Sequence, residues 1–90
     1  MSTIVESEWR SYLQNNAVTH IEILQCENRK YRVKVKLTWK DGEQLLMAAR
    51  GNPREYADID TIVNLISDNI KGKVPPIKLT LYQFQDKEND

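Results

Sequence analysis

The chain contains one cysteine, one histidine and no long apolar run among its 90 residues. A lone Cys26 forms no internal disulfide and holds no zinc by itself, which favours a reducing, cytoplasmic setting. No apolar stretch approaches the roughly 20 residues of a membrane-spanning helix. The opening MSTIVESEWR lacks the basic and apolar regions of a secretory signal. The composition therefore predicts a cytoplasmic globular protein that does not enter a membrane.

Side chains that carry chemistry are correspondingly few. The sequence has no glycine-rich phosphate loop, no CxxC pair and no HExxH pattern. On one strand, His20 and Cys26 would share a face but lie about 20 Å apart at ~3.3 Å per residue. That distance excludes a nucleophile–base pair between them. We therefore expect no enzymatic activity, no metal site and no cofactor.

Charge is balanced, with 13 basic and 13 acidic side chains and a formal net charge of zero. A neutral chain has no overall attraction to DNA or to a membrane, so any binding must come from local clusters. The length allows one domain. We expect a single domain over residues 1–84, followed by a polar tail over 85–90.

Alternation of apolar and polar residues is cleanest over residues 31–39, which predicts a strand with one buried and one wet face. Trp39 is then expected to be buried at the end of this strand, on the core face. Asp41 and Gly42 follow at once and predict a hairpin turn, because a type I′ turn needs positive φ at both central positions. The return strand is expected over residues 44–50.

Helical periodicity appears twice. Residues 6–16 are predicted to form a short helix, and residues 59–71 a second helix with an apolar stripe at i, i+3, i+4 and i+7. Asp58 is the expected N-cap of the second helix. Gly72 is expected at its C′ position, where a left-handed residue commonly ends a helix.

The order of these elements predicts an α+β fold, α-β-β-β-α-β. The meander of strands 17–26, 31–39 and 44–50 is antiparallel. The second helix then crosses over and delivers strand 77–82 parallel to the first strand, by a right-handed connection. We expect a four-stranded mixed sheet in the order third, second, first, fourth, with both helices on one face and the other face open.

Basic side chains concentrate in residues 29–40, a segment without any acid. Arg32, Lys34 and Lys36 are expected to project together from the open face, and Lys78 on the last strand can join them. Such a stripe suits an acidic protein surface or nucleic-acid phosphates. The alternative is a solvated face whose lysines prevent aggregation through exposed strands.

Residues 50–56 form a loop, RGNPREY, immediately before the second helix. Arg50 and Arg54 flank its turn near a helix N-terminus, where free N–H groups attract anions. With Tyr56, these arginines are candidate partner-contacting residues. The alternative is that Arg54 pairs with a nearby carboxylate and Tyr56 packs to brace the turn.

The stretch RGNPREYADIDTIVNLI resembles a pattern found in ParC-like partition-associated proteins, small proteins of plasmids and integrative elements. The resemblance extends from Asp41 through the second helix, with Ile59 where leucine is usual. The matching residues are Arg50, Gly51, Pro53, Arg54, Tyr56, Asp60 and Thr61. This resemblance implies a non-enzymatic accessory protein of a mobile element that acts with partition proteins.

We therefore predict a non-enzymatic accessory protein of a plasmid or other mobile genetic element that binds a macromolecular partner. Two alternatives remain: a small inhibitor of a host defence complex, similar to anti-CRISPR proteins, and a direct nucleic-acid-binding protein. A protein partner is favoured, nucleic acid is a further candidate, a membrane is not expected, and a homodimer is compatible with the sequence. The predicted partner-binding residues are Arg32, Lys34, Lys36, Arg50, Arg54, Tyr56 and Lys78.

Overall fold

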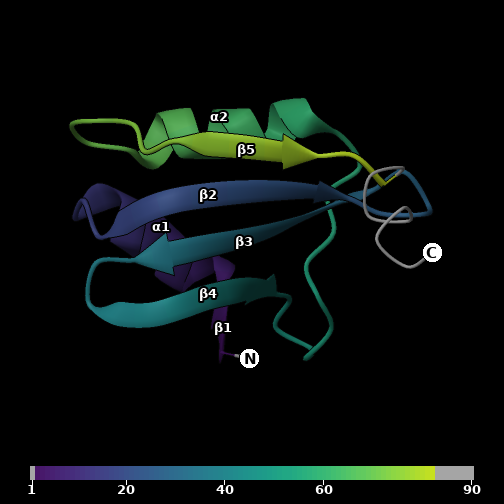
Figure 1. Cartoon of the computed structure of the whole chain (residues 1–90), viewed down its shortest axis with the longest axis horizontal. Helices are drawn as coiled ribbons and strands as arrows, with labels where there is room; N and C mark the ends of the chain where they lie inside the picture. The colour runs from purple at the N-terminus through teal and green to yellow at the C-terminus, as the bar shows by residue number, and fades with distance from the viewer. Residues whose placement is uncertain (1, 83–90) are drawn as a thin grey trace.

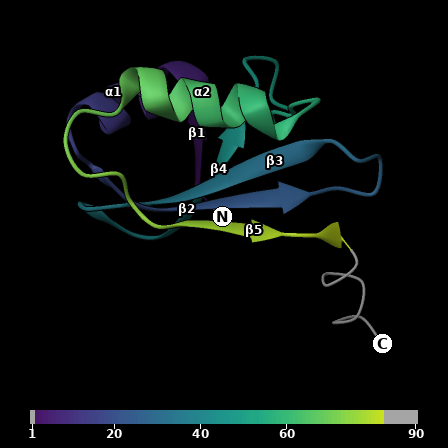
Figure 2. The same cartoon turned by 90° about the horizontal axis from the view of Figure 1, so that it is seen from above.

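The computed structural model describes residues 2–82 and shows an α+β fold, as predicted. The sheet and the helices form two layers, with both helices on the same face of the sheet (Figures 1 and 2). The elements in chain order are β1 (Ser2–Val5), α1 (Glu6–Gln14), β2 (Val18–Gln25), β3 (Tyr31–Leu37), β4 (Lys40–Met47), α2 (Ile59–Asn69) and β5 (Ile77–Thr80). The predicted tail at 85–90 and its boundary at residue 84 lie outside the described residues.

The sheet has the order β1-β4-β3-β2-β5. Strands β2, β3 and β4 form the predicted antiparallel meander, and β5 runs parallel to β2. The prediction of four strands is incomplete, because β1 adds a further strand parallel to β4 at the opposite edge. A four-residue segment that leads directly into a helix is too short to show a period of two, so the sequence pattern misses it.

The β3–β4 hairpin turns at Thr38 and Trp39, not at Asp41 and Gly42. Leu37 pairs with Lys40 across this turn, whereas Lys36 pairs with Glu43. Asp41 and Gly42 are therefore extra residues in β4, where they interrupt the register as a bulge. Gly42 has a φ of 82°, which explains why a glycine stands there.

The prediction that Trp39 is buried is wrong. Its side chain lies at the tip of the hairpin and is 60% exposed. Its ring meets the edge of Tyr12 from α1, with 5.8 Å between ring centroids and 73° between ring planes. The alternation of β3 ends at Leu37, and the turn carries the next two residues out of the sheet.

The core lies between the sheet and the two helices (Figure 2). As predicted, the apolar phase of β3 is buried, and every element except β5 contributes a buried apolar residue. The core also contains Gln44, whose side chain is fully buried and has no hydrogen-bond partner within residues 2–82. The buried residues are Ile4, Trp9, Leu13, Val18, Ile21, Ile23, Val33, Val35, Leu37, Leu46, Tyr56, Ile62, Leu65 and Ile66.

Helix α2 begins as predicted. The Asp58 carboxylate accepts hydrogen bonds from the backbone N–H and the hydroxyl of Thr61, both at 2.9 Å. These bonds, the backbone one first, hold the pKa of Asp58 below its usual value. The helix ends earlier than expected, with Ile70 as its extended C-cap, so Gly72 stands one position beyond C′. No helix in residues 2–82 is long and apolar enough to cross a membrane.

Candidate partner-binding surface

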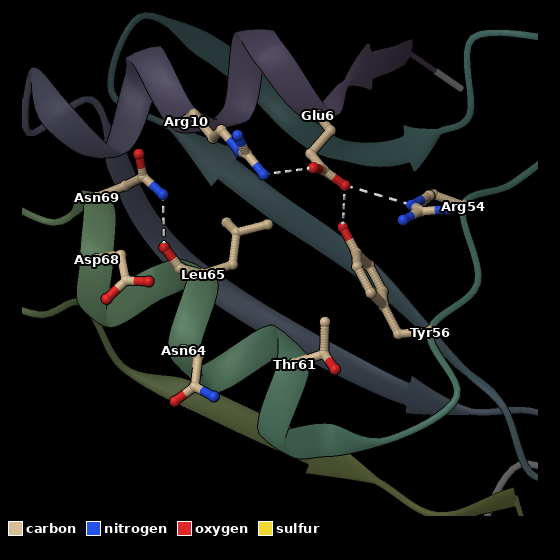
Figure 3. Close-up of a pocket in the computed structure, with 9 residues that line it drawn as sticks. All are labelled: Glu6, Arg10, Arg54, Tyr56, Thr61, Asn64, Leu65, Asp68 and Asn69. Carbon is tan, nitrogen blue, oxygen red and sulfur yellow. Dashed lines mark hydrogen bonds and ion pairs between the residues drawn. The ribbon is translucent and has the colours of Figure 1, made fainter.

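The loop that precedes α2 is fastened to the start of α1 by a cluster of four side chains: Glu6, Arg10, Arg54 and Tyr56 (Figure 3). The hydroxyl of Tyr56 donates to Glu6 Oε2 at 2.7 Å, and Arg54 Nε donates to the same oxygen at 3.3 Å. Arg10 pairs with Glu6 Oε1 at 2.8 Å. We call these residues the loop cluster; Glu6 connects the other three.

Further contacts fix the backbone of this loop to the sheet. Tyr56 and Tyr31 exchange two backbone hydrogen bonds of 2.8 and 2.9 Å, and the backbone N–H of Arg54 donates to the carbonyl of Leu46 at 3.0 Å. The guanidinium carbon of Arg54 also lies 4.8 Å from the centroid of the Tyr56 ring, within cation–π distance. Arg54 and Tyr56 thus brace the loop, as the second interpretation of the RGNPREY motif expects.

Electrostatics in the loop cluster follow from these contacts. Partial burial acts to raise the pKa of Glu6, but the Tyr56 hydrogen bond and the two arginines together hold that pKa below its usual value. Burial, followed by the hydrogen bond to Glu6, raises the pKa of Tyr56 to about 12. The tyrosine stays protonated at neutral pH and acts as a hydrogen-bond donor, not as an acid or base.

A polar cavity of about 560 Å³ lies next to the loop cluster, between α1 and α2. Its lining combines the four cluster residues with Thr61, Asn64, Leu65, Asp68 and Asn69. Glu6 carries one negative charge against the two positive charges of Arg10 and Arg54, so the loop cluster keeps a charge of +1. Asp68, which also lines the cavity, balances this charge, so the lining as a whole is neutral and gives an acidic partner no net attraction.

The predicted basic stripe is divided by an ion pair. Arg32 contacts Glu55 Oε2 through Nε at 3.0 Å and Nη2 at 2.9 Å. The Arg32 hydrogen bond is the first cause that lowers the pKa of Glu55, with a second bond from Asn28. Arg32 therefore connects β3 to the loop before α2, and its charge is neutralised there.

Lys34, Lys36 and Lys78, which we call the open-face lysines, lie together on the sheet face that the helices leave uncovered. They come from two strands, β3 and β5, on either side of β2. The strand register brings Lys34 and Lys78 next to Glu22 of β2, and Lys36 next to Glu43 of β4. Within residues 2–82, none of the three lysines forms an ion pair.

These side chains surround a hollow of about 260 Å³ on the sheet. Its polar lining comes from four neighbouring strands and contains His20, Glu22, Lys34, Lys36, Glu43 and Lys78. Glu22 accepts a hydrogen bond of 2.7 Å from Thr80, which fixes one carboxylate in the middle of the lysines. The open face is thus a surface of mixed charge with a small positive excess.

Arg50 belongs to neither group. Its side chain is exposed at the end of β4 and, in the part of the chain described, makes no hydrogen bond or ion pair. Of the seven predicted partner-binding residues, the structure brings three together as the open-face lysines and ties Arg32, Arg54 and Tyr56 into internal contacts. Whether any of the seven contacts a partner stays a prediction.

Sequence reasoning missed the acids of both regions. Glu22 and Glu43 lie in the polar phase of their strands, so alternation along β2 and β4 was a usable signal for them. Glu6 gave no such signal, because it meets Tyr56 across 50 positions in sequence. Neither His20 nor Cys26 belongs to a cluster: no group of three or more His, Cys, Asp or Glu residues within 2–82 is placed to hold a metal ion.

Comparison of the chain with protein-family models, with curated proteins and with solved structures finds no match in any of the three. The resemblance of residues 50–61 to ParC-like proteins therefore stays a prediction from the motif alone.

Proposed function

We propose that this protein is a non-enzymatic accessory protein that binds another protein through the open face of its sheet. The observation that carries the proposal is the set of open-face lysines, whose charges no ion pair compensates within the described residues. They surround a hollow on the open face of the sheet. Figure 2 shows that both helices lie on the other face. Three lysines without an ion pair, on a concave surface that keeps a small positive excess beside Glu22 and Glu43, suit an acidic protein surface.

Two acids favour a protein over nucleic acid as the partner. Glu22 lies between Lys34 and Lys78, and Glu43 lies beside Lys36 on the neighbouring strand β4. A continuous row of phosphates along these lysines would pass close to both carboxylates. Binding to nucleic acid depends on basic side chains that neutralise several phosphates in succession. A protein partner can instead place carboxylates against the lysines and a donor against each acid, which gives the contact specificity.

The setting that we propose is a plasmid or another mobile genetic element, and its support is the resemblance of the Arg50–Thr61 segment to ParC-like partition-associated proteins. On this proposal the partner is an acidic protein encoded by the same element. The loop cluster then has a structural role, because it fixes the start of α2 and leaves the open face as the contact surface.

The test is capture of the partner with two charge-reversal variants of equal net charge. Lys34→Glu with Lys36→Glu changes the open face, whereas Lys71→Glu with Lys73→Glu changes two exposed lysines that follow α2. We expect tagged wild-type protein and the second variant to capture the same protein from cells that carry the element, and the first variant to lose it. Equal capture by both variants contradicts the proposed surface.

Nuclease treatment of the lysate separates the two classes of partner. Capture that survives nuclease supports a protein contact. Capture that nuclease abolishes, together with direct binding of the purified protein to duplex DNA at low salt, supports the nucleic-acid alternative instead. Capture of a host defence complex in place of a protein of the element would support the inhibitor alternative.

A further inference from the structure

Strand β5 is an edge strand with an incompletely covered apolar side. Within residues 2–82 it pairs with β2 alone, and no strand lies along its outer edge (Figure 1). Ile77 pairs with buried Ile21, and Leu79 with buried Ile23, so both share the core face of the sheet. Yet Ile77 is 44% exposed and Leu79 is 47% exposed, and Leu81, the residue after β5, is 37% exposed.

The backbone of β5 presents groups at Ile77 and Leu79 that pair with no strand within residues 2–82. The N–H of Ile21 donates to the carbonyl of Pro76, so the even-numbered residues of this segment direct their backbone groups toward β2. Backbone groups alternate in direction along a strand. The N–H and C=O groups of Ile77 and Leu79 therefore point outward, where another strand would pair. Leu81 follows β5 by one residue and belongs to the same alternation in sequence.

We infer that β5 is a self-association edge, at which a second copy of this chain adds its own β5 in antiparallel orientation about a two-fold axis at Leu79. The segment Ile77-Lys78-Leu79-Thr80-Leu81 has the same pattern of polarity in both directions. With Leu79 opposite Leu79 of the second copy, Ile77 lies opposite Leu81, and Lys78 opposite Thr80.

This register satisfies three separate requirements. The outward-pointing groups of Leu79 form the reciprocal hydrogen-bonded pair that an antiparallel ladder requires at its centre. The apolar residues of the two copies meet on one face, which covers the exposed side of β5. No like charges oppose each other, whereas a two-fold axis at Lys78 would place two lysines face to face.

The opposite edge of the sheet does not offer the same site. Strand β1 passes directly into α1, and the backbone N–H of Val5 is already bonded to Glu8 Oε1 at 3.0 Å. Because each copy has one free β5 edge, antiparallel pairing closes after two chains and gives a dimer with one continuous sheet.

The first experiment measures mass against concentration by sedimentation equilibrium of the full chain. Wild-type protein is expected to shift from 10.5 kDa toward twice that mass as concentration rises. Leu79→Lys places two lysines at the two-fold axis and is expected to stay monomeric. Val63→Lys adds the same charge at an exposed valine of α2 and is expected to dimerise as wild type.

A second experiment tests the register by mixing two single-cysteine chains in a Cys26→Ser background. In the proposed pairing, residues 78 and 80 of different copies have Cα atoms about 4.5 Å apart, within disulfide range. Under mild oxidation, a mixture of Lys78→Cys and Thr80→Cys chains is expected to form covalent dimers that contain one chain of each kind. Each variant alone is expected to cross-link far less.

Three results would overturn this inference. Wild-type protein that is monomeric at every concentration would leave the β5 edge to a strand from another protein. A Leu79→Lys variant that dimerises like wild type would place the dimer elsewhere on the molecule. Cross-linking of either cysteine variant alone, as efficient as in the mixture, would exclude the register centred on Leu79. Leu79 is on the helix side of the sheet, so the two sedimentation results do not depend on the open-face lysines. The cross-linking test replaces Lys78, one of these lysines, but it measures the register of β5 and not the binding of another protein.

Discussion

The loop cluster and the open-face lysines both bring basic side chains close to carboxylates, but only in the loop cluster do these groups form ion pairs within residues 2–82. In the loop cluster, one carboxylate satisfies two arginines and a buried tyrosine hydroxyl. On the open face, each lysine has an acidic neighbour on the next strand, yet none forms an ion pair within residues 2–82. The difference shows that a basic side chain stays available to a partner only where no carboxylate of the same chain is already paired with it.

The physical reason lies in geometry. The planar guanidinium of Arg54 lies over the Tyr56 ring and donates to Glu6, and the buried Tyr56 hydroxyl holds the same carboxylate in place. A lysine on an exposed strand gains little from a neighbouring carboxylate, because water screens the pair and the long side chain loses entropy when fixed. We therefore expect substitutions in the loop cluster to change stability and substitutions on the open face to change binding.

The largest expected effect on stability comes from a substitution in the hydrophobic core. Leu37→Ala removes a buried side chain of β3 and is expected to lower the free energy of unfolding by about 2–5 kcal/mol, because it leaves a cavity. Urea denaturation measures this change. An effect as small as that of the neighbouring Lys36→Ala would mean that β3 does not separate a buried face from an open one.

The next effect concerns the buried hydroxyl of the loop cluster. Tyr56→Phe removes a hydrogen bond to a charged carboxylate and is expected to cost about 1.5–3 kcal/mol. Tyr31→Phe is the matched control, because no side-chain hydrogen bond of Tyr31 is present within the described residues, and it is expected to cost less than about 0.5 kcal/mol. Equal costs in urea denaturation would contradict the bracing role of Tyr56.

The pH dependence of stability sharpens the comparison further. The folded-state pKa of Glu6 lies below its usual value, so its ionised form contributes stability above the unfolded-state pKa of about 4.3. That contribution is lost as the pH falls through the folded-state pKa. The difference in unfolding free energy between wild type and Glu6→Gln is therefore expected to shrink below about pH 4. Because Glu55 and Asp58 also have lowered pKa values, only this difference isolates Glu6.

Local patterns predicted most of this fold, and non-local contacts account for what they missed. The alternation of β3 and the capping of α2 by Asp58 depend on neighbouring residues, and both were confirmed. The hairpin turns at Thr38 and Trp39 instead, and there the ring of Trp39 contacts Tyr12 of α1. That contact joins residues far apart in sequence, and no pattern within the hairpin indicates it.

The candidate site divides in the same way. Alternation placed Lys34, Lys36 and Lys78 on the open face, and β2 lies between their strands as the predicted order requires. Arg32 and Arg54 instead form ion pairs with Glu55 and Glu6. These acids come close to the arginines only because the loop before α2 and helix α1 pack on the sheet. Sequence spacing locates a charge on a face, but it does not show which acid will neutralise that charge.

The smallest expected effect on stability tests the open face itself. Replacing both Lys34 and Lys36 by alanine is expected to change the unfolding free energy by less than about 0.5 kcal/mol per residue, because neither lysine forms an ion pair in the described part of the chain. The same change should weaken partner binding and reduce its dependence on salt, since these charges act over a distance that is screened within ~10 Å at 0.1 M salt. Calorimetric titration against the captured partner at two salt concentrations measures both quantities.

Replacing Lys71 and Lys73 by alanine controls for net charge and should leave binding unchanged. If the Lys34 and Lys36 variant binds with wild-type affinity and wild-type salt dependence, those lysines only keep an exposed sheet face solvated. The search for the contact then moves to Arg50, a predicted residue whose side chain makes no hydrogen bond or ion pair among residues 2–82.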